Sequence, residues 1–310
     1  MEKFIVVWPK WPLTCGFSEG PSIQSTPSPT SGARSSLISV RLAYFDCIAG
    51  ISGDSALAAL IDAGADLDEV RTHLSTLPLE PFELEIEEVD EHGIPAVRLG
   101  IHTSGTAGVI RTYASVRATL DAADLPADAS QLAHRILRRY AEAEARVQRR
   151  DLESVTFHAV AGLDTIVVVT GTALALTMLG VERVFASAVP TGLGMARTEH
   201  GAMPIPSPTV VELLRGAPLY SRGVTAELTN AAGAAVLAAT VEGYGELPAI
   251  RVETAGYGAG EARLDFPNVT RVLVGAEEPA SSLPTVPGTP ELRLVPELDQ
   301  PDREDDGDAG

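Results

Sequence analysis

Cysteine and positive charge are both scarce in this chain. Cys15 and Cys47 are the only cysteines among 310 residues, too few for the disulfide framework of a secreted domain, so we expect a reducing, cytoplasmic location. The 23 Lys and Arg stand against 42 Asp and Glu, which gives a net charge of −19 at pH 7. Phosphate backbones repel such a chain, and it has no basic stretch interleaved with aromatic residues. Nucleic acid is therefore excluded as a partner.

Long apolar runs are also missing. Residues 4–8 are apolar, but Pro9 ends the run before it reaches the length of a secretory signal core. Residues 165–181 carry no charge, yet they include four threonines and two glycines and are too few to span a bilayer comfortably. We expect a buried helix there and no membrane partner.

The two ends of the chain have the composition of disordered segments. Residues 1–39 are rich in Pro, Ser, Thr and Gly, and we predict a disordered N-terminal extension with the biological start near Val40. Residues 277–310 hold six prolines and ten acids against two arginines, which predicts a disordered acidic tail. Residues 40–276 then form the folded domain.

Within 40–276, apolar strands alternate with helical stretches, which predicts the α/β class: a mixed sheet with packed helices, its strand order undetermined. We expect strands at 40–45, 82–89, 96–101, 184–189, 250–254 and 269–274. We expect helices at 55–63, 113–122, 130–148, 165–181, 209–214 and 231–240.

The most informative passage is 44–54, Tyr-Phe-Asp-Cys-Ile-Ala-Gly-Ile-Ser-Gly-Asp, where a strand leads through a glycine turn into a helix. Asp54 fits an N-cap or first-turn position against the helix dipole, which is the simplest interpretation. A phosphate loop is less favoured because no lysine follows the glycines. The other hypothesis is a metal or metal-cofactor site that uses Asp46, Cys47 and Asp54.

This passage resembles the start of the LarC-type nickel insertion proteins, which place nickel in a pyridinium bisthiocarboxylate mononucleotide to make the nickel-pincer cofactor. The likeness continues in the same order at 57–64, 111–113, 141–147, 164–166, 171–176, 197–201, 204–208, 256–260 and 267–269. The resemblance implies a lyase-type nickel chelatase with the mononucleotide as substrate, nickel as metal and CTP as co-substrate. Members of full length carry a C-terminal half associated with CTP use, in some cases joined by a translational frameshift, so a separate half is an expected partner.

Nickel(II) favours imidazole and thiolate over carboxylate, and this chain has six histidines. The family pattern His-Phe-His-Glu-Val is here Thr156-Phe157-His158-Ala159-Val160, and an acid of the following helix is replaced by Val168. The site implied by the resemblance keeps His158 and Asp164. The alternative for His158 is a histidine whose ring is simply paired within the fold.

The passage 197–201, Arg-Thr-Glu-His-Gly, is expected to be a polar loop stiffened by the prolines that follow. Arg197 is a candidate for the nucleotide phosphate and His200 for a metal ligand, against the alternative of an exposed polar loop. The expected metal-handling residues are thus Asp46, Cys47, His158 and His200, with Asp54 and Arg197 at the cofactor. A non-catalytic carrier and a decayed scaffold without metal are the rival functions.

Two further segments matter. Asn230-Ala231-Ala232 stands where Thr-Pro-Thr is usual in the family, which puts a hydroxyl contact in doubt. Residues 256–260, Gly-Tyr-Gly-Ala-Gly, are expected to form a flexible turn.

Overall fold

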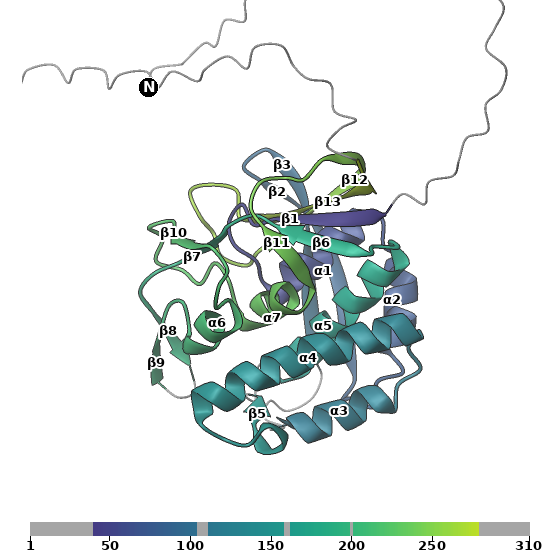
Figure 1. Cartoon of the computed structure of the whole chain (residues 1–310), viewed down its shortest axis with the longest axis vertical. Helices are drawn as coiled ribbons and strands as arrows, with labels where there is room; N and C mark the ends of the chain where they lie inside the picture. Colours follow the sequence, from purple (N-terminus) through teal and green to yellow (C-terminus); the bar gives the residue numbers. More distant parts are fainter. Residues whose placement is uncertain (1–39, 104–110, 158–161, 199–200, 279–310) are drawn as a thin grey trace, which may run out of the picture. The chain divides into compact units, whose positions relative to one another are not determined.

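A computed structural model describes residues 40–103, 111–157, 162–198 and 201–278 (Figure 1). All of them belong to one compact unit, Ser39–Gly310. The expected N-terminal extension and almost all of the expected acidic tail lie outside the described residues, so those domain boundaries stay predictions.

Within the described ranges the main sheet is seven-stranded, and its order is β11-β6-β1-β13-β12-β3-β2. From one edge to the other these strands are β11 (Val241–Tyr244), β6 (Arg183–Ala186), β1 (Arg41–Asp46), β13 (Val269–Glu277), β12 (Ile250–Ala259), β3 (Ile94–Thr103) and β2 (Phe82–Glu91). Strand β1 runs parallel to β6 and antiparallel to β13, so the sheet is mixed. The predicted α/β class is confirmed.

The helices lie in layers beside this sheet. They are α1 (Gly53–Asp62), α2 (Leu67–Leu74), α3 (Tyr113–Asp121), α4 (Ala127–Gln148), α5 (Gly162–Met178), α6 (Pro208–Leu213) and α7 (Ala231–Thr240), with a short 3-10 turn η1 (Leu152–Ser154). Figure 1 shows α1, α5 and α7 between the sheet and the long helix α4, with α3 beyond α4. Helix α5, expected to be buried, is buried along almost its whole length. No helix in the described ranges is long and apolar enough to cross a membrane.

Short strand pairs complete the fold. They are β4 (Arg111–Thr112) with β5 (Thr156–Phe157), β7 (Val189–Thr191) with β10 (Leu219–Ser221), and β8 (Met195–Thr198) with β9 (Gly201–Pro204). The strand expected at 184–189 is in fact two, β6 and β7. Arg197, expected in a loop, lies on strand β8 of the β8–β9 hairpin.

The expected flexible turn at 256–260 is wrong, because β12 continues through these glycines to Ala259. A Cβ atom at Gly256 would lie 2.0 Å from the carbonyl oxygen of Ala59, and one at Gly258 would lie 1.9 Å from that of Ser55. The glycines therefore serve close packing of helix α1 on the sheet.

Candidate functional site

The glycine turn after β1 is set by local backbone chemistry. Gly50 has a φ of +103°, and a Cβ there would lie 2.0 Å from the carbonyl oxygen of Leu228, so glycine is required for both reasons. Ser52 is the N-cap of α1 and forms a capping box with Ser55. Asp54 consequently occupies the first turn of α1, where its carboxylate faces the positive end of the helix dipole.

A segment distant in sequence holds this turn in place. The backbone N–H of Ile51 donates to Thr229 Oγ1 at 3.3 Å, and the N–H of Asn230 donates to the carbonyl of Ile51 at 3.2 Å. Asn230 Oδ1 accepts the N–H of Gly53 at 3.3 Å and that of Gly233 at 2.9 Å. Asn230 therefore caps α7 as a threonine would, and its amide also ties α7 to the start of α1.

Two adjoining cavities open beside this junction. The large cavity has a volume of about 630 Å³ and the small cavity about 410 Å³. They share Asp54, Glu227, Asn230 and Glu261 as a common wall. The first turns of α1, α5 and α7 all reach the large cavity, which is a common position for ligand sites in α/β folds.

Negative charge dominates the large cavity. Its lining includes Asp54, Asp164, Glu227 and Glu261, while Arg197 is the basic side chain among its described lining residues. Burial raises the pKa of Asp54, and the charges of Glu261 and Asp164 raise it further, against an opposing hydrogen bond from Ser52. Partial desolvation raises the pKa of Asp164 and of Glu227 as well, although both residues are exposed as a whole, and Glu261 adds to the effect on Asp164. The excess of carboxylates over basic side chains suits the cavity to a cation or a proton.

The inner wall of the large cavity is a satisfied polar network. Glu144 is 3% exposed, and its carboxylate accepts hydrogen bonds from Thr209 Oγ1 at 2.9 Å and from Gln148 Nε2 at 2.7 Å. Tyr140 packs edge-on against Phe157 with ring centroids 5.1 Å apart. This network fixes the shape of the cavity where α4 lies against α5 and α6.

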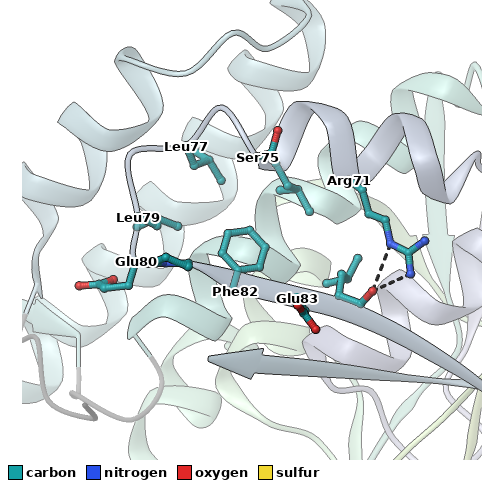
Figure 2. Close-up of a pocket in the computed structure, with 10 residues that line it drawn as sticks. Arg71, Ser75, Leu77, Leu79, Glu80, Phe82 and Glu83 are labelled. Atoms are coloured by element: carbon teal, nitrogen blue, oxygen red, sulfur yellow. Dashed lines mark hydrogen bonds between the residues drawn. The ribbon is translucent and has the colours of Figure 1, made fainter. Parts of the chain in front are cut away.

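A third cavity lacks comparable chemistry. It has a volume of about 510 Å³ and lies between the end of α2 and the start of β2 (Figure 2). Both Nε and Nη2 of Arg71 donate to the carbonyl of Leu84, at 3.1 and 2.7 Å, and Figure 2 shows the Phe82 ring facing the apolar side chains. Glu80 points away from the cavity and pairs with Arg111. We therefore place the candidate site at the large cavity.

Only some of the site residues expected from the sequence lie at the large cavity. Asp54 and Arg197, expected at the cofactor, both line the large cavity, together with Asp164. Val168, which replaces an acid of the family pattern, lines it too. His158 and His200 lie outside the described residues.

Asp46 and Cys47 are not among the lining residues of either adjoining cavity. Asp46 Oδ2 accepts from Arg271 Nη2 at 2.5 Å, so its charge is already paired. Cys47 is 1% exposed, and burial raises its pKa to about 12, which disfavours the thiolate that binds metals. Among the described residues no group of three or more His, Cys, Asp and Glu side chains is arranged to hold a metal ion.

Several residues of the cavity were not anticipated from the sequence. Glu144 lies in the family-like stretch 141–147, yet its role in the wall could not be inferred without knowing which helix face is buried. Glu227 and Glu261 stand in segments without recognisable chemistry, and only the tertiary fold brings them to Asp54.

The chain is thus an α/β protein with an acidic cavity at the N-termini of α1, α5 and α7. The sequence profile of the family described as nickel insertion protein matches residues 43–289, and the chain belongs to this family, as its sequence predicted. No solved structure matches the chain.

Named relatives support the same assignment. A putative nickel insertion protein of Geobacter sp. (strain M21) is 41% identical over 237 residues, which cover 76% of this chain and 62% of the relative. The pyridinium-3,5-bisthiocarboxylic acid mononucleotide nickel insertion protein of Desulfitobacterium hafniense (strain DSM 10664 / DCB-2) is 37% identical over 236 residues, 76% of this chain and 58% of the relative. The chain thus spans about three fifths of the length of these relatives.

Proposed function

We propose that this chain takes part in inserting nickel into pyridinium-3,5-bisthiocarboxylic acid mononucleotide, the substrate in the name of the Desulfitobacterium hafniense relative. The lining of the large cavity carries this proposal, because it brings together residues from three separate family-like segments: Asp54, Asp164 and Arg197. A volume of about 630 Å³ is in the range of small-molecule sites.

The substrate itself supplies part of the metal coordination. Its two thiocarboxylate groups offer sulfur ligands, which nickel(II) accepts readily. The protein then needs to deliver the ion and hold the organic substrate, and it does not need a complete ligand shell.

Formation of a nickel–carbon bond at an aromatic position replaces a C–H bond and releases one proton for each nickel bound. A carboxylate with a raised pKa is suited to accept that proton. Asp54, Asp164 and Glu227 have this property and line the cavity.

For nickel handling we propose His158 and His200 first, with Asp46 and Cys47 in a lesser role. To bind nickel, Cys47 would have to lose its proton, which burial disfavours by raising its pKa. Asp46 would have to break its hydrogen bond with Arg271. At the organic substrate we propose Arg197 as the phosphate contact, with Asp54 ordering the turn. The cytoplasmic location stays a prediction.

The proposal includes dependence on CTP and a lyase-type chelatase reaction. Because the relatives are longer than the matched region, we propose that CTP use requires a further segment, supplied by a separate chain or joined by a frameshift. A nickel or cofactor carrier is the second candidate function, favoured by the sequence departures from the family's ligand pattern at Thr156, Ala159 and Val168.

Incubation of the purified chain with nickel(II) and the mononucleotide, with and without CTP, tests these functions by mass spectrometry. Product containing nickel, formed over several turnovers with CTP, supports the enzyme. Stoichiometric nickel or mononucleotide binding without product supports the carrier. Binding of neither overturns both functions.

A further inference from the structure

The carboxamide of Asn230 lies in the wall shared by the two cavities, between the starts of α1 and α7. Its oxygen is identified by its partners, since the backbone N–H groups of Gly53 and Gly233 both donate to it. The nitrogen, Nδ2, is therefore the other arm of the carboxamide, which points away from these two donors. It makes no hydrogen bond within the described part of the chain.

Several other polar side chains in the lining of the large cavity already have partners. The Thr209 hydroxyl donates to Glu144, and the side chains of Tyr140 and Thr165 bond to each other. Besides the guanidinium of Arg197, Asn230 Nδ2 is thus an N–H donor that the wall leaves for a ligand.

The carboxylates around Asn230 limit which ligand group its Nδ2 can bind. Carboxylates of Asp54, Glu227 and Glu261 share the wall with Asn230 and repel an anion. An anionic group bound at this wall therefore needs a hydrogen-bond donor to offset the repulsion, and Asn230 Nδ2 supplies one.

We propose that Asn230 is a specificity-determining residue, whose Nδ2 donates a hydrogen bond to an anionic group of the mononucleotide while its Oδ1 holds α1 and α7 together. The inference rests on the proposed function. The anionic group is a thiocarboxylate or the phosphate of the substrate, and both present acceptors to an amide N–H.

Three substitutions separate the two halves of this role. Asn230→Asp keeps the capping oxygen and replaces the donor by a second oxygen. Asn230→Ser keeps a neutral capping hydroxyl but loses the reach of the amide. Asn230→Ala removes both and serves as the control for loss of the cap.

Isothermal titration of each full-length variant with pyridinium-3,5-bisthiocarboxylic acid mononucleotide measures the effect. We expect the dissociation constant to rise by about tenfold in Asn230→Asp and Asn230→Ser, the loss of one hydrogen bond to a charged group. The melting temperature should stay close to that of the parent in Asn230→Asp and fall slightly in Asn230→Ser, which loses the bond to Gly53. Nickel(II) titrated alone should bind all variants as it binds the parent. Asn230→Ala should lower both the affinity and the melting temperature.

The dephosphorylated riboside identifies the contacted group. If its affinity is unaffected by Asn230→Ser, the amide contacts the phosphate; if its affinity falls as that of the mononucleotide does, the amide contacts a thiocarboxylate. Unchanged mononucleotide affinity in Asn230→Ser overturns the inference and leaves the proposed function intact. A loss of affinity seen in Asn230→Asp alone has the same meaning, because charge repulsion by the new carboxylate would produce it. A parent protein that binds no mononucleotide overturns both.

Discussion

Thr209 Oγ1 donates to Glu144 Oε1 over 2.9 Å, and this hydrogen bond joins α6 to α4 at the inner wall of the large cavity. Gln148 donates to the second carboxylate oxygen, so both oxygens of a side chain that is 3% exposed have partners. Removal of the carboxylate or of either donor would leave a buried polar group without a partner, which lowers the free energy of unfolding.

Replacement of Glu144 by alanine should therefore lower the free energy of unfolding by about 2–5 kcal/mol, since two donors lose their acceptor and a hole is left beside them. Urea unfolding followed by circular dichroism measures the change. Glu142→Ala, on the same helix and paired with Arg138 and Arg139 near the surface, should cost about 0.5 kcal/mol or less. Equal losses in the two variants would contradict the buried network.

Gly258→Ala should destabilise the protein strongly. The added Cβ would meet the carbonyl oxygen of Ser55 at 1.9 Å, so α1 would have to move away from β12, at a cost of about 3 kcal/mol. Gly243→Ala, in the edge strand β11, meets the Phe185 ring at 3.4 Å and should be tolerated. Thermal melting compares the two, and a stable Gly258→Ala protein would refute the close packing inferred for α1.

Glu227 should make stability depend weakly on pH. Neighbouring atoms partly desolvate its carboxyl and raise its pKa in the folded state, although the residue as a whole is exposed, so solvent reduces the effect. Protonation then favours folding below the pKa of the unfolded chain, and this contribution is lost as pH rises through the folded pKa. Glu227→Gln should consequently raise the free energy of unfolding at pH 7 relative to the parent, and the gain should disappear near pH 4. Chemical unfolding at both pH values tests this, with Glu83, which lines neither adjoining cavity, changed to Gln as the control. A gain that persists unchanged at pH 4 would point to a cause other than ionisation.

Nickel binding should weaken as pH falls through the histidine range near 6.5, because only neutral imidazole binds a metal. His158→Ala should remove much of this binding and leave the stability of the metal-free protein nearly unchanged. Thr156→His combined with Ala159→Glu restores the family pattern and should tighten binding. Isothermal titration with nickel(II) decides the matter: no loss in the first variant would exclude His158 as a ligand.

The strands and helices of the core were largely predictable because hydrophobic periodicity and glycine or proline boundaries are local signals. The glycines of β12 misled the prediction, since composition alone cannot separate a flexible turn from close helix packing. Strand order could not be predicted from local patterns, because β1 pairs with strands more than 130 residues away in the sequence.

The site was predictable only in part. Asp54 and Arg197 were named because they stand in family-like motifs, and both line the large cavity. Glu227 and Asn230 reach the cavity only through the tertiary fold, in which Asn230 bonds to Gly53, and no local pattern encodes this. The family resemblance raised a doubt at Asn230, and the structure answers part of it by showing the amide as the cap of α7.

We propose that nickel and the mononucleotide meet in the large cavity, and product formation by Asp164→Asn tests this most directly. Asp164 lines the cavity, whereas the control Asp68→Asn changes a side chain that is 89% exposed on α2. We expect Asp164→Asn to slow formation of the nickel-containing product by roughly 10–100-fold with an unchanged melting temperature, and Asp68→Asn to behave as the parent. Product formed at the parent rate by Asp164→Asn would contradict the account.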